Sequence, residues 1–320
     1  MKETCLFCEG QEILPYVLDV RDHRRITQDR FDFFKCTRCG SLRLFPLPAK
    51  EYLQKSYPPE YQFSLNQESK RCLKKWWTEL EWRLFYRPAL RFFTRLTASE
   101  THTFSGRALD LGCGNALRLR QFAQEGYEIE GVDFASESLH YARNVLGLNV
   151  KEANIEEIEL PANRYQLLIV YCVLEHLLKP IKLVNQVRVG LIPKGWAVFA
   201  VPLADSWISL LFQSFWVQIR EAPRHIGIPS SQGMYFLLRR NGFKNIKTKP
   251  VSSLELAADV ALTLWSRGNY YSTTGRWSFL RIFDRILVGI LTLLSFPVVY
   301  FLKTLRFKQG LTIFFAQKGD

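Results

Sequence analysis

The residues best suited to chemistry begin at a glycine-rich turn in the first half of the chain. An apolar run ends in Asp110 and continues as Leu111, Gly112, Cys113 and Gly114. Glycine lets the backbone approach a ligand closely, and the helix expected after the turn offers unpaired N–H groups. An acid here would repel a dinucleotide pyrophosphate but attract a ligand with an ammonium or sulfonium group. The turn therefore predicts a site for a positively charged ligand.

A second acid ends the next apolar run. This acid is Asp133, and a carboxylate at the tip of a second strand suits the hydroxyls of a ribose. Position 117 is Leu, so the third glycine of a dinucleotide-binding motif is absent. The two acids together favour a ligand that combines a ribose with a positive charge.

A carboxylate and an imidazole stand side by side at Glu175 and His176, just after another apolar run. A neutral imidazole can remove a proton from a reacting group, and a neighbouring carboxylate can support it. His176 is therefore a candidate general base, with Glu175 beside it. The alternative is that the pair belongs to the scaffold.

Two pairs of cysteines near the N-terminus predict a metal site. They are Cys5 with Cys8, and Cys36 with Cys39, and each Cys-x-x-Cys turn can present two thiolates to one tetrahedral zinc ion. The stretch between the pairs is longer than usual for a zinc ribbon. Two unrelated reduced pairs are the alternative, and a redox role is less favoured because neither pair lies in a βαβ context.

The strands expected to position the acids alternate with helices. They cover residues 127–133, 149–153, 165–171 and 196–201, after a first strand that ends at the glycine turn. Strands that alternate with helices form a parallel sheet, and ligands bind at its carboxyl edge. The sequence therefore predicts an α/β fold with its site at that edge.

Four motifs in order resemble those of class I S-adenosylmethionine-dependent methyltransferases. They span residues 108–115, 131–134, 165–176 and 191–202. The resemblance covers residues 106 to 251 and the end of the chain. It implies a Rossmann-like seven-stranded sheet with helices on both faces, whose antiparallel last strand, 310–318, pairs beside strand six.

The resemblance also implies roles for single residues. The turn from Asp110 to Gly114 would face the methionine part of S-adenosylmethionine, Asp133 would bind the ribose, and Phe134 would stack on the adenine. Asn154, followed by Ile155, falls where relatives often have an acid that binds the adenine amino group, and its amide oxygen can still accept that bond. Tyr171 would lie where cofactor and acceptor meet. His225 falls where relatives often carry a histidine that faces the pocket.

The expected domain organisation has a methyltransferase core between smaller parts. It comprises a zinc ribbon (1–45), a linker with amphipathic helices (46–105), the methyltransferase domain (106–251) with a lid insertion (203–230), an apolar and basic helical insertion (252–309) and the last strand (310–320).

Charge and apolar runs predict where the protein works. The net charge is +13 and the pI is near 9.5, which favours anionic partners, either nucleic acid or an acidic membrane. Residues 286–302 carry no charge, contain Pro297 and have basic flanks, so we expect an in-plane or re-entrant membrane element. A buried cover or dimer interface and a true span are the alternatives, although one span would separate the last strand from its partner.

The basic aromatic helices expected over 70–96 could lie on a bilayer or pack on the catalytic domain.

The sequence thus favours a methyltransferase that acts on a small or lipid-linked acceptor at the cytosolic membrane face. The start of the chain lacks the apolar core of a secretory signal, so we expect a cytoplasmic protein attached peripherally to the membrane. An RNA methyltransferase is one alternative, but Tyr171 to Val173 lack the Asn/Asp-Pro-Pro-aromatic signature of enzymes that methylate base amino groups. A non-catalytic membrane scaffold is another. The oligomeric state, and O-, N- or C-methylation, stay open.

Overall fold

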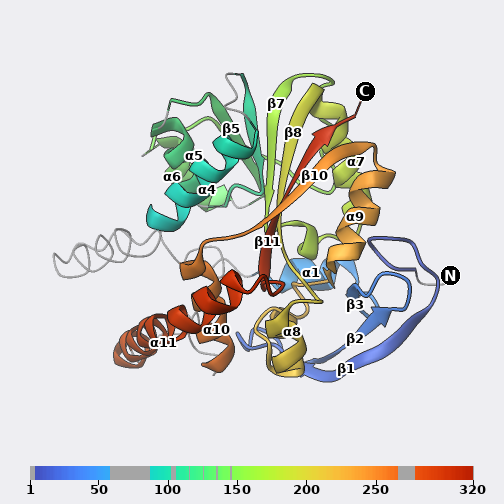
Figure 1. Cartoon of the computed structure of the whole chain (residues 1–320), viewed down its shortest axis with the longest axis vertical. Coiled ribbons are helices and arrows are strands. Elements are labelled where there is room, and N and C mark those ends of the chain that lie inside the picture. The colour runs from blue at the N-terminus through green and yellow to red at the C-terminus, as the bar shows by residue number, and fades with distance from the viewer. Residues whose placement is uncertain are drawn as a thin grey trace.

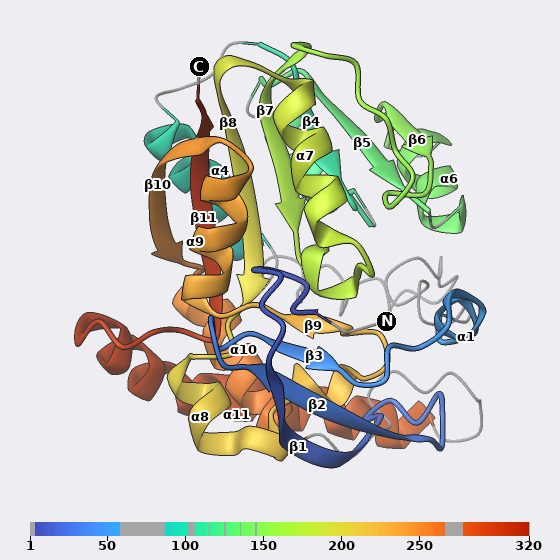
Figure 2. The ribbon, with the colours of Figure 1, turned by 90° about the vertical axis from the view of Figure 1, so that its right-hand side faces the viewer.

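Two β-sheets organise the chain, as seen in a computed structural model (Figures 1 and 2). The structure describes residues 4–57, 87–101, 106–114, 116–124, 126–134, 136–144, 146–265 and 278–319. Residues 70–86 of the expected basic helices lie outside this set.

The larger sheet has seven strands, as the resemblance implied, in the order β10-β11-β8-β7-β4-β5-β6. The strands β4 to β8 pair in parallel, and β11 is antiparallel to both of its neighbours. The predicted place and direction of the last strand are therefore confirmed. The strands are β4 (Ala108–Leu111), β5 (Ile129–Asp133), β6 (Val150–Glu152), β7 (Tyr165–Tyr171), β8 (Leu191–Pro202), β10 (Phe243–Pro250) and β11 (Leu311–Lys318).

Helices cover both faces of this sheet because its central strands are apolar on both sides. In β7, Leu167 and Ile169 pack into one apolar cluster, and Leu168 and Val170 into the other. Figure 1 shows α4, α5 and α6 on one face and α7 and α9 on the other. The helices are α4 (Arg87–Glu100), α5 (Leu117–Gln124), α6 (Ser136–Asn144), α7 (Pro180–Gly190) and α9 (Ser231–Arg240).

The smaller sheet is antiparallel and has the order β1-β2-β3-β9. Its first three strands come from the predicted ribbon, whereas β9 comes from the insertion at 203–230. Figure 2 shows this sheet below the carboxyl edge of the larger one. The ribbon is thus completed by a strand from the catalytic half. The elements are β1 (Ile13–Arg21), β2 (Arg30–Cys36), β3 (Leu42–Leu44), β9 (Gly227–Ile228) and the short helix α1 (Lys50–Lys55) that follows β3.

The predicted lid segment forms short elements around a buried core. Trp216 and Ile219 are fully buried, and the Trp216 indole donates a hydrogen bond to Asp259 at 3.1 Å. The segment is therefore tied to the helices that follow β10. Its elements before β9 are α8 (Trp207–Phe212), η3 (Gln213–Phe215) and η4 (Ile219–Glu221).

The apolar insertion forms two packed helices, α10 (Ser253–Leu264) and α11 (Ser278–Thr304). Residues Ile286–Thr304 are long and apolar enough to cross a membrane, with a mean hydropathy of 2.1, and 17% of that window is buried. The Ser295 hydroxyl donates to the Ala257 carbonyl at 3.1 Å, which fixes one face of α11 against α10. The other face leaves large apolar side chains exposed: Ile286, Ile290, Leu293, Leu294, Phe296, Val298, Tyr300 and Phe301.

The described end of the basic aromatic stretch packs on the catalytic domain. In α4, Phe93 is buried and meets Phe122 of α5 and Tyr171 of β7 edge to face, at ring distances of 6.1 and 5.1 Å. α4 therefore packs on the catalytic domain through Phe93.

Candidate functional site

The glycine turn is a tight elbow fastened to the neighbouring strand. The Gly112 and Cys113 N–H groups both donate to the Val132 carbonyl, at 2.8 and 3.1 Å. Gly112 has a φ of +80°, and a Cβ atom there would come within 2.3 Å of the Val173 side chain, so only glycine fits. A Cβ at Gly114 would meet no atom of the described residues within 4 Å, so these residues leave space beside the elbow.

Both predicted acids lie at this elbow. Asp133 accepts a hydrogen bond from the Gly114 N–H at 2.7 Å. Asp110 is fully buried, and its Oδ2 atom lies 3.2 Å from Nε of Arg118. Burial raises the pKa of Asp110, and the Arg118 charge opposes that rise. The Oδ1 atom of Asp110 has no partner among the described residues.

Arg118 is a site residue that the sequence analysis missed. Its guanidinium donates to the Gly112 carbonyl at 3.1 Å and stacks over the Tyr171 ring at 4.6 Å. The Tyr171 hydroxyl in turn donates to Glu255 at 2.5 Å, at the start of α10. Arg118 and Glu255 therefore hold the Tyr171 side chain in place next to the elbow. The sequence signal that could have revealed Arg118 is a basic residue that stands between apolar positions of α5.

The candidate base His176 has a defined tautomer. Its Nδ1 atom lies 3.0 Å from the Arg224 carbonyl and 3.0 Å from the Tyr57 hydroxyl. A carbonyl oxygen can only accept, so we assign the proton to Nδ1, which leaves a lone pair on Nε2. Burial lowers the pKa of His176 to about 4, so the ring is neutral near pH 7.

The other two predicted catalytic residues gather around His176. The rings of His176 and His225 meet edge to face at 4.6 Å, and Nδ1 of His225 lies 2.8 Å from the Gln218 carbonyl. Burial lowers the pKa of His225 well below its usual value and raises that of Glu175 to about 8. One ligand atom from each of the three lies within 4.8 Å of the others. The trio can therefore share protons or hold a metal ion.

Comparison with known proteins agrees with this geometry. A model described as a methyltransferase domain matches residues 81–248, more than half of the chain. The chain belongs to this methyltransferase family. Its seven-stranded sheet is that of the class I S-adenosylmethionine-dependent enzymes.

Individual relatives are distant. Two curated proteins named ubiquinone biosynthesis O-methyltransferase match, one from Bordetella avium at 29% identity over 100 residues and one from Paraburkholderia phymatum at 28% over 109. The matches cover 29% and 32% of this chain, and 42% and 47% of the relatives, less than half of their length. A structure described as a sarcosine dimethylglycine methyltransferase from Galdieria sulphuraria aligns at a TM-score of 0.50 with 15% identity, over 73% of this chain and 86% of that one.

The elbow of this methyltransferase fits the cofactor of its family. S-adenosylmethionine combines a ribose, an adenine and a sulfonium, and the elbow offers Asp133, an exposed Phe134 and the unpartnered Oδ1 of Asp110. Cys113 and Ile155 are buried beside it. The Asn154 side-chain oxygen already accepts a bond from the Glu156 N–H at 3.1 Å, and its predicted contact with adenine stays a prediction.

Tyr57 is a second residue that the sequence analysis missed. Its ring meets Phe134 edge to face at 5.7 Å and His176 at 6.2 Å. It therefore contacts both the residue predicted to stack on adenine and the candidate base. The sequence offered no signal, because Tyr57 precedes two prolines and was assigned to a linker.

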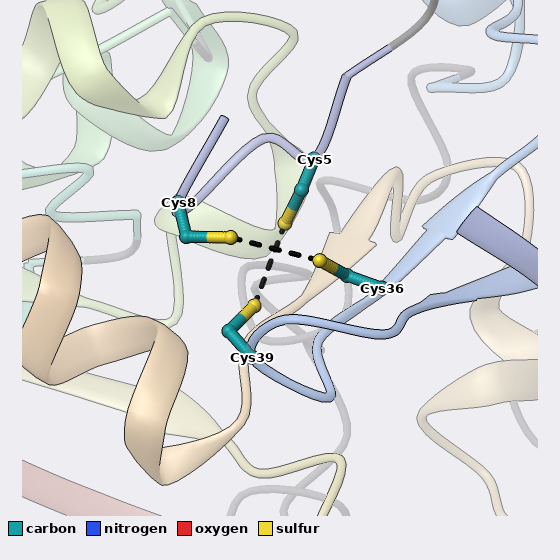
Figure 3. A group of neighbouring side chains, drawn as sticks. All are labelled: Cys5, Cys8, Cys36 and Cys39. Carbon is teal, nitrogen blue, oxygen red and sulfur yellow. Dashed lines mark hydrogen bonds between the residues drawn. The ribbon is translucent and has the colours of Figure 1, made fainter. Parts of the chain in front are cut away.

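The four predicted metal ligands converge in one buried cluster (Figure 3). The Sγ atoms of Cys5 and Cys39, and those of Cys8 and Cys36, lie 3.6 Å apart. Sulfur atoms around a tetrahedral zinc ion lie about 3.8 Å apart, given Zn–S bonds of about 2.3 Å. Burial raises the pKa of Cys8 to about 12, whereas a hydrogen bond from Cys5 lowers that of Cys39 to about 5. The donor set and its spacing fit zinc.

Proposed function

We propose that the chain transfers a methyl group from S-adenosylmethionine to a hydroxyl of a lipid-linked acceptor at an anionic membrane face. The observation that carries this proposal is the neutral His176, with its Nε2 lone pair, beside a cofactor elbow of the methyltransferase family. We also propose that the cysteine cluster holds a structural zinc ion.

The site residues divide the chemistry between them. When bound, S-adenosylmethionine supplies an electrophilic methyl group on a sulfonium. Asp133 and the elbow would hold the ribose and fix the orientation, and His176 Nε2 would take the proton that the acceptor hydroxyl loses on methylation. The Glu175 carboxyl, whose pKa burial raises to about 8, is protonated near pH 7 and adds no negative charge beside His176.

The hydroxyl acceptor is supported by the base and by the names of the relatives. A general base is most useful where the acceptor atom carries a proton that must leave, as an oxygen does. The two curated relatives are named as O-methyltransferases of ubiquinone biosynthesis, whose name refers to a lipid-soluble product. An acceptor of this class would reach the enzyme from a membrane.

The membrane face is supported by exposed apolar residues at one end of the molecule. The helices α8, α10 and α11 lie side by side there in both views (Figures 1 and 2). Leu211 on α8 and Leu294 on α11 are 67% and 68% exposed. Because β10 and β11 pair directly, both ends of the insertion belong on one side of a membrane, which favours in-plane docking. Arg306 is exposed beside α11, and the net charge of +13 complements anionic lipids.

The proposed reaction is tested with the full chain and radiolabelled S-adenosylmethionine. Candidate acceptors are a long-chain alkyl catechol in anionic phosphatidylglycerol vesicles, a water-soluble catechol and total RNA. We expect label in the vesicle catechol and a slower rate with the soluble one. Label in RNA alone would favour the RNA alternative, and no label with saturable cofactor binding would favour a scaffold.

Membrane docking is tested by sedimentation with the same vesicles. The double variant Leu293→Glu, Leu294→Glu places two charges on the exposed face of α11 and should lose binding. Leu18→Glu is the matched control, because Leu18 is 56% exposed on β1, outside the helical insertion. Equal sedimentation of wild type and double variant would refute docking through α11.

A further inference from the structure

The ribbon sheet is joined to the acceptor side by a run of backbone hydrogen bonds. The Ile226 carbonyl accepts from the Leu44 N–H at 2.8 Å, and the Ile226 N–H donates to the Glu175 carbonyl at 2.7 Å. Beyond Ile226, β9 pairs with β3. The ribbon sheet therefore continues through one residue into η2 (Leu174–His176), the turn that carries the proposed base.

A buried ion pair makes a second connection. Arg224 is fully buried, and its guanidinium donates to both carboxylate oxygens of Asp22, at 2.6 and 3.1 Å. Asp22 lies in the loop between the two cysteine pairs. The backbone carbonyl of the same Arg224 accepts from Nδ1 of His176 at 3.0 Å. One residue thus joins a ribbon carboxylate to the imidazole.

The neighbouring charges complete this network. Arg224 also donates to Glu221 at 2.9 Å, and Glu221 accepts from Arg24 of the ribbon at 2.7 Å. Burial alone would raise the pKa of Glu221, but Arg24, His23 and Arg224 hold it well below its usual range. Two carboxylates therefore balance two guanidinium groups inside the protein, as buried charges require. The long stretch between the cysteine pairs is explained, because it supplies residues 22–24.

The cysteine cluster holds the other end of the same segment. The Ser230 N–H donates to the Ser41 hydroxyl at 2.9 Å, and the Ser230 hydroxyl donates to the Cys39 carbonyl. The Ser41 hydroxyl also lies 3.2 Å from the Cys39 sulfur. Residues 224–230 are thus attached to the ribbon at the loop and at the second cysteine pair. The cofactor elbow, in contrast, is held by β5 and Arg118.

We infer that the zinc ribbon positions the acceptor side of the methyltransferase, with Asp22 acting through Arg224 as a positioning residue for His176. The role of His176 as the base rests on the proposed function. The mechanical coupling between the ribbon and the turn at 174–176 does not depend on it. Loss of zinc or of the Asp22 charge loosens the acceptor side and leaves cofactor affinity unchanged.

Hydrogen–deuterium exchange of the zinc-loaded full chain tests this coupling. Asp22→Asn keeps the shape of the side chain but removes its charge. We expect exchange at 171–176 and 219–228 to become about tenfold faster, with 106–114 and 126–134 unchanged. Asp19→Asn is the matched control, because Asp19 forms an exposed ion pair with Arg30 on the same hairpin. Chelation of zinc from the wild type is a second route to the same pattern, and it covers the case in which Asp22→Asn fails to fold.

Two further readouts separate positioning from a general loss of structure. The pKa of His176, followed by NMR of histidine-labelled protein, should rise from about 4 toward its ordinary value in Asp22→Asn, because the ring gains water. The affinity for S-adenosylhomocysteine should stay within about twofold of the wild type. Unchanged exchange at 171–176, or equal acceleration in the elbow, would overturn the inference. Faster exchange at 171–176 without methyl transfer to any acceptor would refute the proposed reaction but would leave the coupling supported.

Discussion

The proposed cofactor half and the proposed acceptor half of the site are built in different ways. The elbow of the cofactor half and its two acids lie within one stretch of sequence, from Asp110 to Asp133, and the elbow is fastened to the next strand. The acceptor half combines Tyr57, Glu175, His176 and the Arg224–His225 pair, with the ribbon behind them. Recognition of the cofactor therefore depends on a local motif, whereas the acceptor site depends on tertiary packing. The two halves should respond separately to mutation.

The largest expected effect is on catalysis. His176→Ala should lower methyl transfer to the vesicle-borne catechol by about 10²- to 10⁴-fold, because a general base contributes on this scale. Cofactor affinity should not change. Scintillation counting of the extracted lipid gives the rate, and calorimetry gives the affinity. A rate within threefold of the wild type would remove His176 from the mechanism.

The next effect concerns the cofactor half alone. Asp133→Asn should weaken binding of S-adenosylhomocysteine by about 100-fold, because charge-assisted bonds to the ribose are lost. Calorimetric titration measures it. Glu152→Gln, at the exposed end of the neighbouring β6, is the control and should bind normally. Equal affinity of Asp133→Asn and wild type would show that Asp133 does not bind the ribose.

A stability effect distinguishes the buried acid of the acceptor half. Burial raises the pKa of Glu175 to about 8, above its ordinary value of 4.5. Between these two pH values the folded state holds a proton that the unfolded state has already lost. Its contribution to stability therefore falls as the pH rises through this window. The free energy of unfolding of Glu175→Gln, relative to that of the wild type, should rise by about 2 kcal/mol as the pH is raised from 6 to 8. Urea denaturation at both pH values measures this change. If the difference in unfolding free energy between the variant and the wild type did not change with pH, Glu175 would not be protonated in the folded state.

The smallest expected effect tests the adenine end. Asn154→Asp restores the acid that relatives often carry, and a charged acceptor should tighten cofactor binding by about 1 kcal/mol, or fivefold. The Glu156 N–H can bond to either side chain, so the turn is preserved. Calorimetry measures this change too. Weaker binding by Asn154→Asp would show that the adenine amino group lies elsewhere.

The sequence allowed the larger sheet and the cofactor half to be predicted for a physical reason. Apolar strands, turn glycines and the acids that follow them are adjacent in the chain, so their periodicity and spacing carry the information. The antiparallel last strand was predicted from resemblance and is confirmed.

The contacts between distant segments were not predictable. The sequence does not show that β9 pairs with β3, that Asp22 pairs with Arg224, or that Tyr57 contacts His176. Arg118 was overlooked because a basic side chain in a helix usually faces water, whereas here Asp110 and the Tyr171 ring stabilise it inside. These contacts become evident only in the folded structure.

The central claim is that a positively charged methyl donor binds at the elbow between Asp110 and Asp133. Calorimetric titration of the wild-type chain with S-adenosylmethionine and S-adenosylhomocysteine tests it most directly. The account predicts one saturable site per chain for both ligands, with binding retained after chelation of zinc. Absence of binding for both ligands would contradict it.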